Sequence, residues 1–599
     1  MRSSLGKRKH DETVLAQDPL NSQQDSCSPG SKRQRLENAS RKSTFCTIKN
    51  TNFYSTSAYS DLDASKHEIR LLKILPDSGS GPVECELLPK RRLADVEEKY
   101  TALSYVAGDP KNIEVILVDG VRCNVFANLD YALREARNFW SQNHKDEEFL
   151  LWVDQICIDQ SNDSERSHQV GFMREIYQSA KQTLASLSAD DRNWDGEGLA
   201  WFQELYEHLP LELDPYRPTN MRDVLVLFTQ NPQDAINFTF RQHRREESGY
   251  FHALEYLKDN IRKSSFVTGW VAFRDLLLSP WWSRAWIFQE FISSTVVYFL
   301  NGRQSVCWNN SSKTWFMLCI IHNQLIKHEK DQQDSVLNKL ATTILEQSHR
   351  VRERFSSAEF DEKTRFEPVQ FVIASRMSWA GSVDLVTLLK YAQSCHASDS
   401  RDKIFALLGL SNPGYDIVPS YEKSIREILI ETTKRIMTFE DSLDVLAYVR
   451  PSRLHSSSSL PSWVVDWVSR WESLELPSSL VYRPFSKFKK ENSSFSFLMG
   501  SGGQGPTFLQ VWGARIDYMF LFEMEKRWRN KSSQSSDPTV EMWMLEGASF
   551  PLALRPIGDG YLIDGDYVAE RDWQAPGLLY EVPDSGIKDC MVWKRIFLV

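Results

Sequence analysis

The 599-residue chain has no long apolar run, and this absence excludes one class of protein. A helix that crosses a bilayer needs about 20 consecutive apolar residues, and no stretch approaches that length. The N-terminus is polar and basic and lacks the apolar segment of a secretory signal. We therefore expect a protein without a membrane span that stays in the cytoplasm.

Cysteine is sparse and scattered. The nine cysteines lie at 27, 46, 85, 123, 157, 307, 319, 395 and 590, and no two have C-x-x-C spacing. Cys395 and His396 are adjacent, but no second ligand pair accompanies them. We expect no disulfide framework and no bound metal, in a reducing compartment.

A strong excess of either charge is also missing. The formal net charge is -9, from 71 Lys and Arg against 80 Asp and Glu, which argues against a nucleic-acid-coating protein. Hydrophobic residues make up 41% and charged residues 25%, as in ordinary globular proteins. Because single cores stop growing well below this length, we expect several domains.

The first 50 residues have few of the aromatic and branched side chains that build a core. Phe45 is the one aromatic residue among the first 50, which also hold eight serines. We expect residues 1–60 to form a disordered basic, Ser-rich tail. Two basic clusters, at 7–9 and 32–35, favour equally a nuclear-import signal and a solvated tail.

From His67 onward the patterns indicate an α/β domain with a partly parallel sheet. Strands are predicted at 67–75 and 99–106, and Asp119-Gly120 joins two β-branched runs as a type I′ hairpin. Asn128 is predicted to cap the helix that follows. The apolar positions of that helix are Leu129, Leu133, Ala136 and Trp140.

We divide the rest of the chain by composition. Residues 61–300 form the α/β domain, with a charged insertion near 194–263. Residues 301–450 are mainly helical in pattern, with helices predicted near 398–409 (capped by Ser398 or Asp399 and ended by Gly409) and at 422–437. Residues 451–599 read as β-rich. The glycines at 500–505 match G-x-G-x-x-G, but Pro506 and a strand follow them, so they indicate a surface loop.

An acid cluster follows the predicted strand at 150–153. Asp154, Asp159, Asp163 and Glu165 lie within twelve positions. Asp154 comes at the carboxyl end of the strand, where open α/β sheets place their ligand crevices, and capping does not account for Asp154 or Asp159. They are candidate catalytic residues. A calcium loop is not indicated, because the central glycine is missing.

The later part of the cluster also has a purely structural interpretation. Asn162 can cap the next helix with Glu165 as its third residue, an arrangement in which Gln would serve as well. The helix itself is predicted from one apolar stripe, made of Val170, Met173, Tyr177, Ala180 and Leu184.

A second dense stretch spans 280–290. Trp282 and Trp286 are predicted to share one helical face and pack in the core. Arg284 is predicted either to stack on a Trp or to pair with an acid of the 154–165 loop. There is no P-loop lysine motif and no G-x-S-x-G elbow.

Three motifs, YTALSYVAGDP, LWVDQICIDQSNDSERSHQVGFMREIYQSA and SPWWSRAWIFQEF, resemble the fungal heterokaryon-incompatibility (HET) domain family in order and spacing. SRDKIFALLGL, LPSWVVDW and FPLALRPIGDGYLIDGDYV are similar to blocks that follow the domain. Two positions depart from the family pattern: Ala107 stands in place of Trp, and Ala185–Ser188 in place of Trp-Leu-Gly. The motif residues are Tyr105, Gly108, Trp152, Cys157, Gln160, Gln169, Tyr177, Trp281, Arg284, Trp286, Gln289, Glu290 and Asp402.

The resemblance implies a role in fungal non-self recognition, in which incompatible fusion triggers programmed cell death. It also implies a Toll/interleukin-receptor-like fold, some members of which cleave NAD through a glutamate. Glu165 is the candidate for that glutamate, beside Asp154 and Asp159. No cofactor is implied, and NAD enters only as a substrate.

The expected partner is another protein or an allelic recognition factor, with oligomerisation left open, and neither nucleic acid nor membrane. Two alternatives stay open. One is a non-enzymatic signalling or scaffold protein, and the other is a nuclear regulator that uses the basic tail.

Overall fold

The computed structural model describes residues 59–76, 81–144, 147–187, 196–208, 263–312, 362–377, 381–449, 460–469, 495–499, 506–515, 541–548, 551–563 and 593–599, with a few isolated positions. The predicted tail up to residue 49, with its two basic clusters, lies outside the described residues. So do most of the charged insertion at 194–263 and the loop at 500–505.

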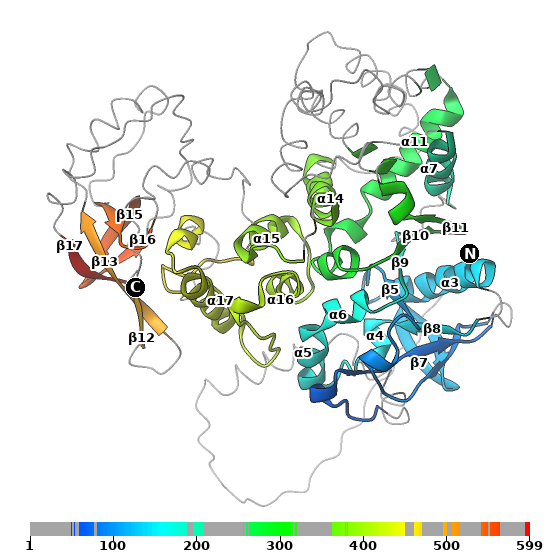
Figure 1. The fold of residues 1–599 in the computed structure, drawn as a ribbon, viewed down its shortest axis with the longest axis horizontal. Coiled ribbons are helices and arrows are strands. Elements are labelled where there is room, and N and C mark those ends of the chain that lie inside the picture. Colours follow the sequence, from blue (N-terminus) through cyan, green and yellow to red (C-terminus); the bar gives the residue numbers. More distant parts are fainter. Residues whose placement is uncertain are drawn as a thin grey trace, which may run out of the picture.

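The N-terminal part is an α/β domain around a mixed sheet (Figure 1). The strand order is β11 (Gln304–Cys307), β10 (Val297–Asn301), β9 (Gln182–Ser186), β5 (Thr101–Ser104), β8 (Phe149–Trp152), β2 (Leu72–Ile74), β3 (Glu84–Leu87), β6 (Ile113–Val118) and β7 (Val121–Phe126). Strands β10, β9, β5 and β8 are parallel to one another. β2 is antiparallel to β8, and β6 to β7. The predicted α/β class with a partly parallel sheet is confirmed.

The central strands are buried on both faces, as expected for near-continuous apolar runs. All residues of β5 and β9 are buried. The hairpin between β6 and β7 has Asp119 at φ 53° and Gly120 at φ 75°, which confirms the predicted type I′ turn. The predicted strand at 67–75 is instead two short strands, β1 (Glu68–Ile69), which pairs with β4 (Arg91–Arg92), and β2.

Helix α3 (Ala127–Asn143) packs on the sheet through the predicted stripe, because all four predicted apolar residues are buried. The predicted cap is wrong, since the helix begins at Ala127 and Asn128 lies inside it. The Asn128 side chain lies against Gly108, where a Cβ would meet its Nδ2 at 2.6 Å. Gly108 also has φ 80°, so a glycine suits this turn on both counts.

The chain after β8 forms α4 (Asp154–Cys157), α5 (Asp163–Gly171) and α6 (Met173–Gln178). The predicted single helical stripe is wrong at its end, because Leu184 lies in β9. Residues 183–185 pair in parallel with both β5 and β10. This tertiary pairing overrides the helical spacing that links Leu184 to Val170 in the sequence.

The next layer begins with α7 (Glu197–His208) and α11 (Ser264–Leu277), which pack on each other. The chain then forms a 3-10 turn (Pro280–Ser283), an extended residue at Arg284 and a π-helical turn (Phe288–Ile292). Trp282 and Trp286 therefore do not share one helical face, contrary to the prediction. Trp282 is buried, and Trp286 is partly buried and touches both hydrophobic cores.

A helical region follows, with α14 (Glu362–Met377), α15 (Leu385–Tyr391), α16 (Asp402–Leu408) and α17 (Ile425–Glu440). α16 ends at Gly409 as predicted, but it begins after Arg401, so neither Ser398 nor Asp399 is its N-cap. α17 starts with a capping box between Ser424 and Glu427.

The C-terminal strands are β12 (Ser496–Met499), β13 (Pro506–Arg515), β14 (Glu541–Leu545), β15 (Pro551–Ile557), β16 (Gly560–Ile563) and β17 (Trp593–Leu598). They close into a small barrel, because β17 pairs with both β16 and β13. One hydrophobic core runs from Val170 through the helical region to Leu598 in this barrel. A separate core lies under the sheet of the α/β domain.

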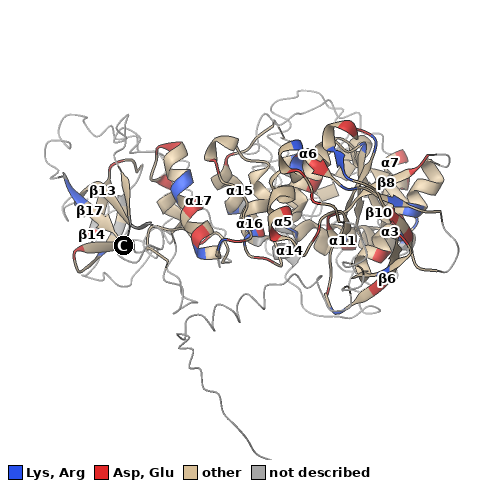
Figure 2. Ribbon diagram, turned by 90° about the horizontal axis from the view of Figure 1, so that it is seen from below, with Lys and Arg blue, Asp and Glu red and all other residues tan. Residues whose placement is uncertain are grey.

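Charges of both signs are interspersed on the ribbon, for example along α17 and over the α/β domain (Figure 2), in keeping with the near balance of the whole chain. Across the part of the chain that the structure describes, no helix is both long and apolar enough to cross a membrane.

Candidate functional site

Three segments that are far apart in the sequence meet at the carboxyl ends of the parallel strands. Ser104 is the last residue of β5 and Tyr105 follows it, and Asp154 and Gln155 begin α4, one residue after the end of β8. The third segment is 281–290, which follows α11. In open α/β sheets this edge is where ligands bind, so the convergence makes it the candidate site.

The centre of the site is formed by Ser104, Trp281, Arg284 and Glu290, which we call the Arg284 cluster. Arg284 forms a bidentate pair with Glu290, with Nη1–Oε2 and Nη2–Oε1 distances of 2.7 Å each. The Ser104 hydroxyl accepts from Trp281 Nε1 at 2.8 Å and from Arg284 Nη1 at 3.3 Å, and it donates to Glu290. Each polar group thus has a partner, as low-dielectric surroundings require.

The ion pair between Arg284 and Glu290 in this cluster is largely buried. The Glu290 side chain is 1% exposed and the Arg284 side chain 17%. Burial disfavours the charge of Arg284, but Glu290 and Asp154 outweigh this effect and raise the pKa of its guanidinium. The predicted pairing of Arg284 with an acid of the 154–165 loop is therefore wrong as to the main partner, which is Glu290.

Asp154 lies beside this cluster and is partly exposed. Its Oδ1 accepts from the Gln155 N–H at 2.7 Å and faces the Tyr105 hydroxyl at 3.3 Å. Burial, and then the negative charge of Glu290, raise the pKa of Asp154 to about 6, while Arg284 opposes the shift. A carboxyl group with such a pKa can exchange a proton near neutral pH.

Tyr105 links Asp154 to Gln155. Its hydroxyl lies 3.0 Å from Gln155 Oε1 as well as 3.3 Å from Asp154 Oδ1. One hydroxyl carries one proton and donates to one acceptor at a time. Gln155 is 5% exposed, and its Nε2 has no hydrogen-bond partner among the residues that the structure describes. The polar groups at this edge of the sheet can therefore form more hydrogen bonds than they form with one another.

Four motif residues hold the ends of β5 and β8 in place. The Tyr177 hydroxyl donates to the Leu103 carbonyl at 3.0 Å, and the Tyr177 ring meets Trp152 edge to face at 5.5 Å. Gln160 Nε2 donates to the Asp154 carbonyl at 2.8 Å. Cys157 is fully buried, and burial raises the pKa of its thiol to about 12, so it packs rather than reacts.

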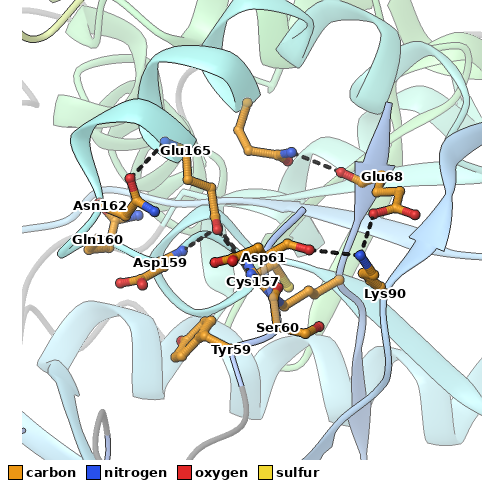
Figure 3. Close-up of polar contacts among 12 residues, drawn as sticks. Tyr59, Ser60, Asp61, Glu68, Lys90, Cys157, Asp159, Gln160, Asn162 and Glu165 are labelled. Atoms are coloured by element: carbon orange, nitrogen blue, oxygen red, sulfur yellow. Dashed lines mark hydrogen bonds and ion pairs between the residues drawn. The ribbon is translucent and has the colours of Figure 1, made fainter. Parts of the chain in front are cut away.

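Glu165 lies in a different setting (Figure 3). Arg70 donates to both of its carboxylate oxygens, at 2.6 and 2.9 Å, and the Asp159 N–H donates to Oε1 at 2.7 Å. The Arg70 and Glu165 side chains are 2% and 7% exposed. Asn162 caps α5 as predicted, accepting from the Glu165 N–H at 3.1 Å, but the Glu165 carboxylate turns to Arg70 instead of completing a capping box.

A small pocket of about 150 Å³ adjoins Glu165. His168, which lines it, lies with Nε2 3.0 Å from the Ala64 carbonyl, and burial lowers the pKa of its imidazole. The Glu165 oxygens are already engaged by Arg70 and Asp159. The pocket is lined by Asp61, Leu62, Ala64, Asn162, Ser164, Glu165 and His168.

Asp159 and Asp163 each contact a residue that lies two or three positions later in the chain. Asp159 Oδ1 accepts from the backbone and hydroxyl of Ser161, at 2.9 and 2.6 Å. Asp163 pairs with Arg166 at 3.0 Å. Of the three predicted catalytic acids, the structure places Asp154 beside the Arg284 cluster, Asp159 in its own turn and Glu165 on Arg70. Their catalytic roles stay predictions.

Three further motif residues connect elements. Gln169 Nε2 donates to the Glu68 carbonyl at 2.9 Å, and Gln289 Nε2 to the Phe405 carbonyl at 3.2 Å. Asp402 accepts from the Tyr421 hydroxyl at 2.6 Å, and burial raises its pKa to about 6. Within the described residues, no group of three or more His, Cys, Asp or Glu could hold a metal ion.

Sequence reasoning did not single out Ser104, Gln155 or Arg70. Ser104 and Gln155 each adjoin the carboxyl end of a predicted buried strand, a position that could have marked them. Arg70 carried a weaker signal, a charge inside an otherwise apolar strand pattern, which requires a buried partner.

The three segments that meet at this edge lie within a region that matches a known protein family. The family model described as "Heterokaryon incompatibility protein (HET)" matches residues 100–290, from the start of β5 to Glu290. The chain is 27% identical over 452 residues to "Heterokaryon incompatibility protein 6, OR allele" of Neurospora crassa. That alignment covers 71% of this chain and 61% of the relative, so the chain spans less than two thirds of the relative's length. No solved structure matches.

Proposed function

The chain carries a heterokaryon-incompatibility (HET) domain, and we propose that it acts in fungal non-self recognition as an effector that triggers cell death. The convergence of the three motif segments on one site supports this proposal. The relative from Neurospora crassa is named as an incompatibility protein, which supports the same biological setting. A protein partner or allelic factor would supply the trigger.

The single observation that carries the proposal is the surroundings of Asp154. The carboxyl group of Asp154, a partly exposed residue, has a pKa of about 6 and lies beside a largely buried ion pair. Its charged form is disfavoured by burial, so holding it there costs folding free energy. Such a cost is typical of a group retained for chemistry or binding.

We further propose a Toll/interleukin-receptor-like arrangement and, within it, NAD as the substrate. Cleavage of the nicotinamide bond needs a carboxylate to meet the positive charge that develops on the ribose. Both oxygens of Glu165 are engaged by Arg70. Asp154 is the less engaged acid, and the geometry favours it over Glu165 for this role.

Inducible expression in Neurospora crassa tests the biological proposal. The full chain is expected to arrest growth and to give dye-permeable, dead cells. Asp154→Asn keeps the size of the side chain and an oxygen for the Gln155 N–H, and it is expected to abolish arrest at equal protein level. Asp163→Asn, which alters a surface acid of the same loop, is the matched control and is expected to arrest growth. Continued growth at high wild-type protein level would contradict the proposal.

Nicotinamide release by the purified full chain separates enzyme from scaffold. Release by the wild type and Glu165→Gln, with loss in Asp154→Asn, supports Asp154 as the catalytic acid. If only Glu165→Gln loses nicotinamide release, and that variant is folded, Glu165 is supported as the catalytic acid instead. Growth arrest without any nicotinamide release favours the signalling or scaffold function, in which the site binds a partner.

A further inference from the structure

The backbone around Arg284 is held by a segment from the helical region. Arg284 is extended, with φ −75° and ψ 136°, and pairs with His396 as an isolated parallel bridge. The Ala285 N–H donates to the His396 carbonyl at 3.0 Å, and the His396 N–H donates to the Ser283 carbonyl at 2.6 Å. Two backbone bonds thus fix the residue whose side chain forms the centre of the site.

A second contact lies at the end of α16. Arg174 of α6 donates from Nη1 to the Gly409 carbonyl at 3.0 Å, and Gln289 donates to the Phe405 carbonyl at 3.2 Å. A Cβ on Gly409 would lie 3.0 Å from Gln289 Cδ and 3.1 Å from Arg174 Cβ. Glycine at 409 is thus what allows this close approach to the 281–290 segment.

A third contact fixes the same region against α5. The guanidinium carbons of Arg166 and Arg401 lie 4.2 and 5.1 Å from the centre of the Tyr421 ring. The Tyr421 N–H donates to the Ser167 hydroxyl at 3.1 Å. The residues that follow β8 in the α/β domain therefore also rest on the helical region.

The same segment is tied to the C-terminal strands. Lys403 donates to the Val468 carbonyl at 2.9 Å, and the Ser462 N–H donates to the carbonyl of Val599, next to β17. Ile404, Phe405 and Leu407 belong to the hydrophobic core that extends to the barrel. Contiguous packing and hydrogen bonding of this kind can carry energetic coupling.

We propose that residues 395–421 are a positioning segment of the candidate site, through which the C-terminal region controls whether Arg284 engages Ser104 and Glu290. With the segment docked, the Arg284 cluster is assembled. With it displaced, Arg284 loses the backbone support that aims it, and the site is switched off. This regulation rests on the proposed function, because it concerns the same site.

Gly409→Ala in the full chain tests the proposal, with Gly171→Ala as its matched control. A Cβ on Gly171 meets no atom of the described residues within 4 Å. The readout is the pKa of Asp154. In the wild type, Gly409→Ala and Gly171→Ala, the melting temperature is measured over a range of pH with and without the additional substitution Asp154→Asn. The pH at which the difference between the two melting temperatures changes gives the pKa of Asp154. Since an opposite charge nearby lowers the pKa of a carboxyl group, withdrawal of Arg284 is expected to raise that of Asp154 by about one unit. Gly171→Ala is expected to leave it unchanged.

A purely structural segment gives a different result. Gly409→Ala would then lower the melting temperature equally at all pH values and leave the pKa of Asp154 in place, which overturns the proposal. If Gly409→Ala does not fold, Arg166→Ala instead removes the contact between the Arg166 guanidinium and the Tyr421 ring. Its control, Asp163→Ala, removes only the Arg166–Asp163 pair. An upward shift in Arg166→Ala but not in Asp163→Ala supports the proposal, and equal values in both overturn it.

The outcome is distinguishable from failure of the proposed function. A wild-type chain that does not arrest fungal growth contradicts the function but leaves the titration of Asp154 measurable. If the wild type does arrest growth, Gly409→Ala is expected to lose arrest while Gly171→Ala keeps it.

Discussion

Arg284 and Glu290, which lie six residues apart in one motif, form an ion pair. Arg284 also donates a hydrogen bond to Ser104, which lies 180 residues earlier at the end of β5. The motif forms no continuous helix there, because Arg284 itself is extended and Glu290 lies in a π-helical turn. The irregular backbone is what lets both side chains reach the carboxyl end of β5. The conformation of 281–290 therefore serves the site rather than the core alone.

Removal of one partner of this pair is expected to be costly. Arg284→Ala leaves Glu290 buried without a counter-ion and should lower the free energy of unfolding by about 3–5 kcal/mol. The double variant Arg284→Met with Glu290→Leu removes both charges and should recover most of that loss. Urea denaturation at pH 7 measures both. A double variant no more stable than Arg284→Ala would show that the charges themselves are not the source of the cost.

Three buried carboxyl groups should each contribute stability that is lost as the pH rises from about 4 to 7. The pKa values of Asp154, Asp402 and Glu440 are raised to about 6, 6 and 7, in each case mainly by burial. A raised carboxyl pKa means that the folded state holds its proton more tightly than the unfolded state. Its stabilising effect is complete below the ordinary pKa near 4 and is lost through pH 6 to 7.

Asp154→Asn isolates one of these groups. The variant should match the wild type near pH 4 and exceed it by about 1–2 kcal/mol at pH 7.5, since the charged form is then no longer buried. Thermal melts at several pH values give the difference, with Asp163→Asn as the surface control. A difference that is the same at pH 4 and pH 7.5 would mean that Asp154 titrates in its ordinary range.

The sequence predicted those parts of the fold that depend on local patterns. The hairpin at Asp119-Gly120, the strand before Asp154 and the Asn162 cap all follow from short-range chemistry, and the structure confirms each. The partly parallel sheet was also predicted, because the order of strands and helices along the chain restricts the topology.

Long-range partners were out of reach of local patterns. Leu184 fits a helical stripe, yet pairing with two parallel strands places it in β9. Glu165 fits a capping box, yet Arg70, which lies 95 residues earlier, takes its carboxylate. At the site, Asp154 could be marked from its place after a strand. The Arg284–Glu290 pair could not, because it depends on an irregular backbone that propensity does not predict.

The β6–β7 hairpin allows a test of backbone strain alone. A Cβ on Gly120 meets no atom within 4 Å in the described part of the chain, so Gly120→Ala adds no clash there, but φ 75° disfavours any side chain. We expect a loss of about 1 kcal/mol. Asp119→Asn should change stability by less than about 0.5 kcal/mol, because Asn tolerates a positive φ and keeps an oxygen for the Leu87 N–H. Equal losses in both would argue against the type I′ turn.

Glu165→Gln separates the two interpretations of the acid cluster by stability. A residue that only caps α5 would tolerate Gln. In the structure, however, Gln would leave the Arg70 guanidinium, 2% exposed, without its counter-ion. The carbonyls of Ser60 and Cys157 still accept from Arg70, so the loss is expected at about 3 kcal/mol rather than more. Asn162→Ala, which removes the cap but keeps the ion pair, should cost about 1 kcal/mol. Urea denaturation of the full chain ranks the two. If Glu165→Gln were as stable as the wild type, the ion pair would contribute nothing, and the carboxylate would be free to serve as the catalytic acid.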